Sequence, residues 1–327
     1  MKTILVTGGL GFIGSNFLNN YVPSNPKDTI INVDSESYAS SFESTHNLSK
    51  FSNYTYLNID INSYSSVLDL FKNYEFDLII HFAAESHVDN SITDPLIFAK
   101  TNVLGTLNLL QAFKTYKAFK NKLFYHVSTD EVYGSTVNGS FNESSNFDPS
   151  SPYSASKASS DHFVKAFFKT YNLPVIVSNC SNNYGPWQYK EKLIPTVVSS
   201  IIQNKRIPVY GKGLNVRDWI HVDDHISAIN LLIKKGVIGE SYCIGSNNEL
   251  SNIKLIKKIC KISDKFLNKD SNSFDLVEFV DDRLGHDIRY SIDSNKLQEL
   301  GWKTNVSFDE SLQITIKWYI ENPEWII

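Results

Sequence analysis

Close to its start the chain reads Ile4-Leu5-Val6-Thr7-Gly8-Gly9-Leu10-Gly11-Phe12-Ile13-Gly14, an apolar strand followed by a glycine-rich turn. Gly9, Gly11 and Gly14 fit the pattern G-x-G-x-x-G, and Gly8 adds a further position for a tight turn. We expect the next helix to run from about Phe12 to Tyr21. Glycines between a strand and a helix let backbone N–H groups approach a pyrophosphate at the helix N-terminus. In this context the motif predicts a dinucleotide site.

A second strand, Thr29 to Val33, ends at Asp34, twenty residues after Gly14. A carboxylate at this place accepts hydrogen bonds from the adenosine ribose hydroxyls and repels a 2′-phosphate. Asp34 therefore favours NAD over NADP. The alternative interpretation is a turn cap.

Further strands and helices alternate along the first half of the chain. We expect a third strand at Leu57 to Ile61, with Asp60 and Ile61 beside an adenine, and a fourth at Asp77 to Phe82. The small residues Ala83 and Ala84 follow it, and a helix is expected from Pro95 to Tyr116. This alternation predicts an α/β fold with a doubly wound parallel sheet. Its ligand should lie outside the carboxyl ends of the strands.

Composition excludes several classes of protein. The chain has 327 residues, 42% hydrophobic and 20% charged, which is ordinary for a globular protein. A net charge of −4 argues against nucleic-acid and membrane-surface partners. Three widely spaced cysteines suggest neither disulfides nor a metal site, and are expected to be buried, reduced thiols of a cytoplasmic protein. No apolar run approaches the roughly twenty residues of a membrane-spanning helix, and a signal peptide is not expected.

The segment Ser128-Thr129-Asp130-Glu131-Val132-Tyr133-Gly134 follows an apolar run, Leu123 to Val127, that predicts a buried strand. Two adjacent carboxylates at such a strand end are unfavourable near an apolar core unless they have a purpose. The alternative is a polar turn in which Asp130 caps the next segment.

A helix expected to begin at Ser151-Pro152 carries Tyr153 and Lys157 four residues apart, hence on one face and about 5.4 Å along the axis. A Lys ammonium there can lower the pKa of a phenol from about 10 toward neutrality. Such a phenol could take a proton from a substrate hydroxyl as hydride leaves the same carbon. A Tyr–Lys pair alone occurs by chance, but the glycine turn and Asp34 accompany this one.

Together, T-G-G-x-G-x-x-G, S-T-D-E-V-Y-G and Y-S-A-S-K resemble the extended short-chain dehydrogenase/reductase family. More closely they resemble its nucleotide-sugar 4,6-dehydratases of the dTDP-glucose type, for which the Asp130-Glu131 pair is the discriminating feature. The resemblance runs from Thr3 to about Trp318. It implies a Rossmann-type NAD-binding domain at 1–180, and a smaller mixed α/β domain at 181–327 that mainly binds the nucleotide sugar, with some chain crossing back.

The resemblance also implies a reaction. Tyr153 would deprotonate the glucose 4-hydroxyl while hydride passes to NAD+, with Lys157 orienting the ribose and Thr129 bonding the 4-oxygen. Glu131 would remove the proton from C5, and Asp130 would protonate the oxygen that leaves C6 as water. The product from dTDP-glucose or UDP-glucose would be the NDP-4-keto-6-deoxyglucose, an early step toward rhamnose or other deoxysugars.

Site residues and partners follow from the matching segments. The cofactor set is Gly8, Gly11, Phe12, Ile13, Gly14, Asp34, Asp60, Ile61, Ala83, Ala84, Ser86, Thr101, Ser128, Tyr153, Lys157, Asn179 and Asn182. The set implied for the nucleotide-diphosphate sugar is Ser86, His87, Thr129, Glu131, Asn183, Lys192, Leu193, Pro208, Tyr210, Arg217, Asn252, Arg283 and His286. A planar guanidinium suits phosphate oxygens physically. No metal is expected, and a homodimer is expected through the Pro95–Tyr116 and Tyr153–Tyr171 helices.

Three departures and two alternatives stay open. Asn90 stands where bacterial sequences of this type usually carry Arg, Leu284 stands where Pro is common, and the region from Ser35 to His46 retains only Tyr38-Ala39 of the usual pattern. No residue visibly distinguishes dTDP from UDP, although the segment S-N-N-Y-G-P leans toward dTDP. The alternatives are a nucleotide-sugar 4-epimerase or decarboxylase on the same scaffold, and a non-catalytic NAD-binding protein.

Overall fold

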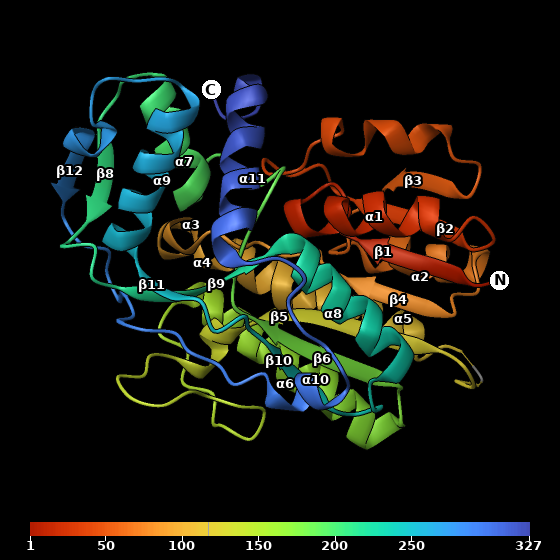
Figure 1. The fold of residues 1–327 in the computed structure, drawn as a ribbon. Coiled ribbons are helices and arrows are strands. Elements are labelled where there is room, and N and C mark those ends of the chain that lie inside the picture. Colours follow the sequence, from red (N-terminus) through yellow and green to blue (C-terminus); the bar gives the residue numbers. More distant parts are fainter. Residues whose placement is uncertain (117) are drawn as a thin grey trace.

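A seven-stranded parallel sheet forms the centre of the computed structural model, which describes residues 1–116 and 118–327. The strand order is β10-β6-β5-β4-β1-β2-β3 (Figure 1). This order contains the 3-2-1-4-5-6 arrangement of dinucleotide-binding folds and confirms the predicted doubly wound sheet. The strands are β1 (Thr3–Thr7), β2 (Thr29–Asp34), β3 (Tyr54–Asn58), β4 (Leu78–His81), β5 (Leu123–Thr129), β6 (Val175–Cys180) and β10 (Ser241–Ile244).

Alternating side chains of these strands fill two separate cores. Ile4 and Val6 pack on one face against α1 (Phe12–Ser24) and α8 (Val222–Lys235). Leu5 points to the other face, which is covered by α2 (Tyr64–Asn73), α5 (Thr106–Phe113) and α6 (Pro152–Tyr171). Because both of their faces are buried, the central strands are mainly apolar rather than alternating.

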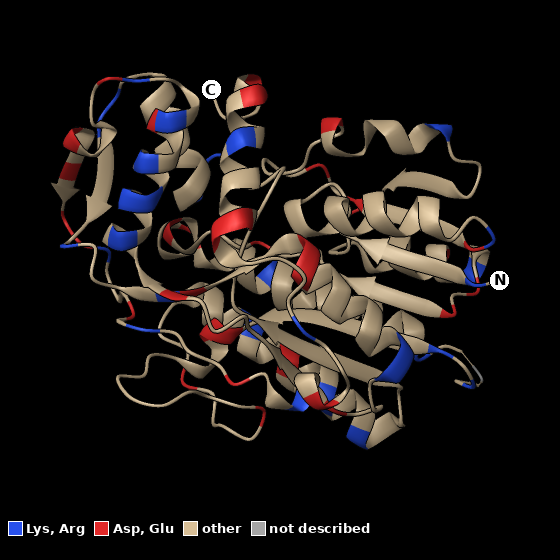
Figure 2. Ribbon diagram, viewed as in Figure 1, with Lys and Arg blue, Asp and Glu red and all other residues tan. Residues whose placement is uncertain are grey.

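Charged residues are nearly absent from the large sheet, as Figure 2 shows. Within its seven strands, all of which the structure describes, Asp34 is the one Asp, Glu, Lys or Arg, and it ends β2. Within these strands an acidic or basic side chain, histidine aside, therefore occurs only at the carboxyl end of β2.

The second half of the chain builds a smaller unit beside these ends and returns one strand, β10, to the large sheet. Figure 1 shows α7, α9 and α11 standing apart from the large sheet beside β8 and β12. The division at residue 180 stays a prediction. The remaining strands are β7 (Asn182–Tyr184), β8 (Ile207–Tyr210), β9 (Val216–His221), β11 (Glu249–Ser251) and β12 (Val277–Val280). The remaining helices are α3 (Val88–Thr93), α4 (Pro95–Phe98), α7 (Leu193–Ile202), α9 (Asn252–Phe266), α10 (Asn295–Glu299) and α11 (Phe308–Glu321).

Short helical turns complete the chain. A π-helical segment, η2 (Ala99–Gly105), joins α4 to α5. The 3₁₀ turns are η1 (Glu43–Lys50), η3 (Asp130–Tyr133), η4 (Ser273–Leu276) and η5 (Pro323–Trp325).

The third strand was predicted three residues too late. β3 is an edge strand whose Tyr54 to Asn58 pair with Ile30 to Asp34, and its side chains are only partly buried. The apolar residues that suggested a strand lie after its end, where Ile59 and Ile61 face the cavity described below. An edge strand lacks the apolar run of a central one, so the hydrophobic pattern pointed to the wrong residues.

The helix predicted over Pro95–Tyr116 is interrupted by η2. There Asn102 donates to Glu85 O at 3.0 Å and to Ser156 Oγ at 2.8 Å, and it accepts from Glu85 N. A π-helical turn inserts an extra residue into the helix and often marks a functional site. Periodicity alone does not distinguish it from a regular helix.

Two further expectations concern the cysteines and membrane-spanning helices. Cys180, Cys243 and Cys260 are free and buried, as expected. Among the described residues no helix is both long and apolar enough to cross a membrane.

Candidate active site

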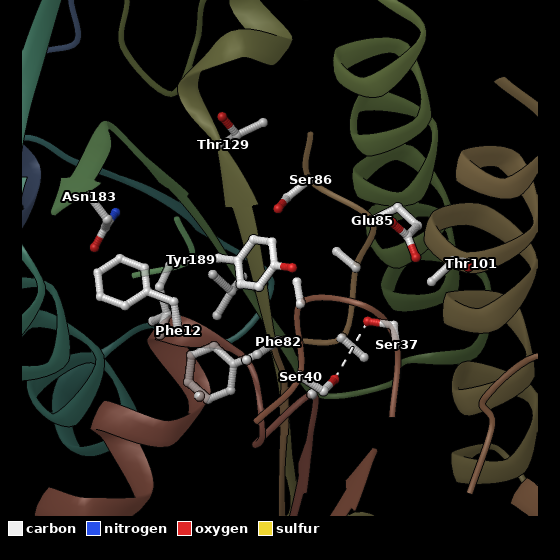
Figure 3. A pocket seen from close by; sticks show the side chains of 18 of the residues that line it. Phe12, Ser37, Ser40, Phe82, Glu85, Ser86, Thr101, Thr129, Asn183 and Tyr189 are labelled. Atoms are coloured by element: carbon white, nitrogen blue, oxygen red, sulfur yellow. Dashed lines mark hydrogen bonds between the residues drawn. The ribbon is translucent and has the colours of Figure 1, made fainter. Parts of the chain in front are cut away.

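A cavity of about 300 Å³ lies at the carboxyl ends of β1, β2, β4 and β5. Figure 3 shows side chains from segments distant in sequence around it: Phe12 at the start of α1, Ser86 after β4, Thr129 at the end of β5 and Asn183 on β7. The parallel sheet brings these segments together, because its strand ends share one edge.

The glycine turn forms one wall of the cavity. A Cβ on Gly14 would lie 2.3 Å from Gly8 O, so only glycine allows α1 to pack this closely on the turn. Gly11 is the N-cap of α1, and no side chain caps it. The first N–H groups of α1 are thus left for a ligand, as a pyrophosphate requires.

Asp34 is held rigidly at the end of β2. Its Oδ2 accepts from Leu10 N at 3.0 Å, and its Oδ1 accepts from Glu36 N at 3.0 Å and from Ser40 Oγ at 2.7 Å. A carboxylate has about four acceptor positions, so one position on Oδ2 remains for a ribose hydroxyl. Asp34 caps the turn and also lines the cavity, so the two interpretations of this residue are compatible.

Thr129, Asp130 and Glu131 form the turn η3 at the end of β5. Thr129 Oγ1 accepts from Glu131 N at 3.2 Å and donates to Asp130 Oδ1 at 3.4 Å. Burial, then the negative charge of Glu131, raises the pKa of Asp130 well above its usual value. Burial also raises the pKa of Glu131, but the cations Arg217 and Lys192 oppose this. Burial and Glu131 therefore favour the protonated form of Asp130, whereas Arg217 and Lys192 favour the ionised form of Glu131.

Tyr153 lies on α6, as the sequence predicted. Ser151 caps this helix in a capping box with Ser154, and Pro152 occupies its first turn. The expectation that Lys157 lowers the phenol pKa is not met. Burial, then the charge of Glu131, raises the pKa of Tyr153 well above 10. Lys157 Nζ is instead directed to Val127 O, to which it donates at 2.8 Å.

Two cations stand near Glu131. Arg217 on β9 donates to Asp287 O at 3.0 Å, and its guanidinium lies 4.1 Å from the centre of the Tyr290 ring. Lys192 donates to Ser86 O at 3.0 Å across the cavity mouth. Both are positioned by the second half of the chain, so the substrate side of the site is assembled from both halves.

A second group of residues predicted for the substrate lies further out. Arg283 makes a paired contact with Asp89, with Nε 2.6 Å from Oδ1 and a terminal nitrogen 2.9 Å from Oδ2. Its guanidinium lies 5.2 Å from the Tyr210 ring, and His286 lies 6.3 Å from the same ring. The Arg283 guanidinium, which the sequence analysis assigned to a diphosphate, is therefore paired with the Asp89 carboxylate in this structure.

The cavity wall contains nearly all of the predicted cofactor residues: Gly8, Gly11, Phe12, Ile13, Gly14, Asp34, Asp60, Ile61, Ala83, Ala84, Ser86, Thr101, Ser128, Tyr153, Lys157 and Asn182. Asn179 is absent from the wall, because its amide donates to Asp161 Oδ2 and to Thr129 O behind the strand ends.

Of the predicted substrate residues, the wall includes Ser86, Thr129, Glu131, Asn183 and Lys192. It does not include His87, Leu193, Pro208, Tyr210, Arg217, Asn252, Arg283 or His286. No group of three or more potential metal ligands occurs in the part of the chain that the structure describes.

Sequence reasoning missed several residues of the wall, among them Ser40, Glu85, Tyr189 and Glu191. Glu191 accepts from Tyr38 at 3.1 Å, which joins two loops across the cavity. Its place directly before Lys192 could have indicated it. Nothing in the sequence marks Tyr189.

Comparisons with known proteins agree with this geometry. The family model described as GDP-mannose 4,6 dehydratase matches residues 5–315. A probable dTDP-glucose 4,6-dehydratase of Sinorhizobium fredii is 47% identical over 332 residues, covering 98% of this chain and 94% of the relative. The dTDP-glucose 4,6-dehydratase of Salmonella typhimurium is 42% identical, covering 99% and 94%.

Solved structures of nucleotide-sugar enzymes share the fold of this chain. The dTDP-glucose 4,6-dehydratase of Streptomyces venezuelae, solved with NAD and a second ligand, has a TM-score of 0.91 at 42% identity and covers 99% of this chain and 98% of its own. A UDP-glucose 4-epimerase of Thermotoga maritima has a TM-score of 0.87 at 27% identity, covering 98% and 99%.

One consequence of the geometry concerns Tyr153. Replacing Glu131 by Gln should lower the pKa of Tyr153 by about one pH unit, because an anion beside a phenol disfavours the phenolate. Ultraviolet titration of tyrosinate, taken as the difference from the matching Tyr153→Phe proteins, measures this pKa. Glu191→Gln, which removes a cavity carboxylate paired with Tyr38, is the control. An unchanged or raised pKa in Glu131→Gln would contradict the geometry.

Proposed function

The chain belongs to the nucleotide-sugar 4,6-dehydratases, the family whose model spans residues 5–315, and on this premise we propose that its own substrate is dTDP-glucose. The enzyme is a lyase that uses NAD. The proposed product is dTDP-4-keto-6-deoxyglucose with release of water, an early step toward rhamnose or other deoxysugars.

The observation that carries the proposal is the turn η3, which presents Asp130 and Glu131 to the same cavity as Tyr153. Elimination of water needs an acid for the leaving oxygen and a base for the neighbouring carbon. The pKa of Asp130 is raised by burial and by Glu131, so Asp130 holds a proton. Arg217 and Lys192 favour the ionised form of Glu131. Two adjacent carboxyl groups thus have different tasks because their environments differ.

The cavity fits NAD on observations of the chain itself. The uncapped start of α1 and the close packing at Gly14 suit a pyrophosphate, and the open acceptor position of Asp34 suits a ribose hydroxyl. Bound NAD supplies a temporary acceptor for the hydride of the sugar.

The protein's own groups perform the remaining steps of the proposed reaction. Tyr153 takes the proton of the 4-hydroxyl, with the Thr129 hydroxyl beside it. Because burial and Glu131 raise the pKa of Tyr153, the ionised fraction of this phenol grows as the pH rises. The 4-ketone acidifies C5, from which Glu131 removes the proton, and Asp130 protonates the oxygen at C6 so that it leaves as water. Return of the hydride to C6, with a proton added at C5, would complete the 6-deoxy product and restore oxidised NAD.

The dTDP form is supported by the names of the relatives, while the described residues include no contact that selects a thymine over a uracil. An epimerase remains the nearest alternative, since the T. maritima epimerase shares the fold. Epimerisation expels no water, so an epimerase has no leaving oxygen for Asp130 to protonate. A non-catalytic NAD-binding protein would need neither Tyr153 nor Glu131 in the cavity.

Three free, buried thiols are typical of a reducing compartment and support a cytoplasmic location.

A homodimer is part of the proposal. Leu96 and Ile97 on α4, Leu104 on η2 and Phe163 on α6 are exposed apolar residues on helices that pack against one another. These are the helices for which the sequence predicted a dimer interface. A second copy of the chain would bury them.

Turnover of purified protein with dTDP-glucose and with UDP-glucose tests the proposed substrate. We expect a 4-keto-6-deoxy product from dTDP-glucose, at least tenfold faster than from UDP-glucose. Faster turnover of UDP-glucose would reverse the nucleotide assignment. An NDP-galactose product would instead establish the epimerase, and no turnover of either sugar would favour a binding protein.

Two variants test the roles of the acid and the base. Glu131→Gln should still oxidise the sugar at C4 and then stop, so that the absorbance of reduced nicotinamide accumulates. Asp130→Asn should slow water loss by about a hundredfold or more, the usual contribution of a general acid. Glu191→Gln is the control from the same cavity wall. Full dehydratase activity in either variant would contradict its assigned role.

Substitution of an exposed interface residue tests the dimer. Leu104→Glu should convert the protein to a monomer in sedimentation at micromolar concentration, because a buried charge at an apolar interface is unfavourable. Val237→Glu alters an apolar residue of similar exposure, 57% against 53%, outside these helices and should change nothing. A wild-type protein that sediments as a monomer would overturn the proposal.

A further inference from the structure

Lys157 is a buried cation with an incomplete set of partners. Only 4% of the surface of Lys157 is exposed. Within the described chain its one hydrogen bond is to the carbonyl of Val127, at 2.8 Å. A neutral carbonyl does not balance an ammonium charge removed from water, so another group must stabilise the charge.

Five ionisable groups face Lys157 from the elements packed around it. They are Tyr153 and Asp161, one turn before and one turn after it on α6, together with His126 on β5, His81 on β4 and Cys180 on β6. Burial lowers the pKa of both histidines and raises the pKa of Tyr153, and it raises that of Cys180 to about 12. All four are neutral near pH 7, which leaves Asp161 as the charged member of this set.

Asp161 is completely buried, and the side chains of Asn179 and His126 lie against its two oxygens. Asn179 Nδ2 donates to its Oδ2 at 2.9 Å, and His126 Nε2 lies 3.2 Å from its Oδ1. Although burial acts to raise the pKa of Asp161, His126, Lys157 and Asn179 together hold it below its usual value.

The proton of His126 can be located from its neighbours. Ser160 donates its hydroxyl proton to Lys157 O at 2.8 Å, so Ser160 Oγ can only accept from His126 Nε2, 3.3 Å away. His126 Nε2 therefore carries a hydrogen, which it directs to Ser160. The neutral imidazole lies 3.2 Å from Asp161 Oδ1 and adds no second charge beside the carboxylate.

We propose that Asp161, held ionised by His126 and Asn179, is a positioning residue that keeps Lys157 protonated in the buried strand ends. Asp161 is absent from the cavity wall and acts through the charge of Lys157. Lys157 is in the wall, on the side assigned to the cofactor. The loss of its proton therefore sets the upper pH limit of cofactor binding. The link to the cofactor rests on the proposed function, whereas the titration of Lys157 is a property of the chain alone.

Titration of Lys157 by NMR tests the proposal directly. The protein is labelled at the lysine side chains, and Lys157→Met identifies the signal. In Asp161→Asn, Lys157 should lose its proton about one to two pH units lower than in the wild type, because the removed anion favoured the charged form. Ser159→Ala, which removes an exposed hydroxyl that bonds Ala155 O on the same helix, should leave the titration unchanged. Equal titrations in Asp161→Asn and the wild type would overturn the proposal.

The affinity for NAD, measured by calorimetry across the same pH range, gives a second readout. The pH at which the affinity declines should be lower in Asp161→Asn by the same interval, and it should be unchanged in Ser159→Ala. An unmoved decline would show that Asp161 does not act through Lys157. A protein without dehydratase activity that still shows the Lys157 shift would disprove the proposed function and leave this inference standing.

A double variant covers the case in which Asp161→Asn fails to fold. Removing the ammonium as well, in Lys157→Met/Asp161→Asn, should restore folding, because no buried charge is left unbalanced. Melting of the two proteins side by side measures this recovery. A double variant no more stable than Asp161→Asn would show that Asp161 supports the fold by other contacts and would overturn the proposal.

Discussion

The burial of the large sheet on both faces is the constraint from which the site follows. Helices cover each face, so the strands are apolar along their length and admit a charged residue only at Asp34. Polar groups can then gather only where the parallel strands end. Gly8, Asp34, Ala83 and Thr129 come from four different strand ends and line one cavity for this reason.

Charges beside that apolar core persist only where a neighbour compensates them. Burial and Glu131 raise the pKa of Asp130 and so favour its neutral form, whereas Arg217 and Lys192 oppose the effect of burial on the pKa of Glu131. Lys157 needs a carboxylate deeper in the fold. The same physical requirement thus produces an acid, a base and a fixed cation around one cavity, because the compensation differs at each one.

The smaller unit supplies what the sheet lacks. Strands with no Lys or Arg cannot provide the cations that favour an ionised Glu131, so these come from Lys192 and from Arg217 on β9. Their positions depend on contacts between distant segments, such as the bond from Arg217 to Asp287 O. The base is therefore complete only when both halves of the chain are folded together.

By itself the sequence determined the alternation of strands and helices in the first half of the chain, the glycine turn, the acidic pair and the Tyr–Lys helix, because each of these depends on local spacing and periodicity. It misplaced β3, because an edge strand lacks a continuous apolar run, and it missed the π-helical turn around Asn102. Only the tertiary structure decided the protonation of the site. Burial and the direction of the Lys157 ammonium toward Val127 O depend on distant segments, and they raise the pKa of Tyr153 where its spacing from Lys157 had suggested the reverse.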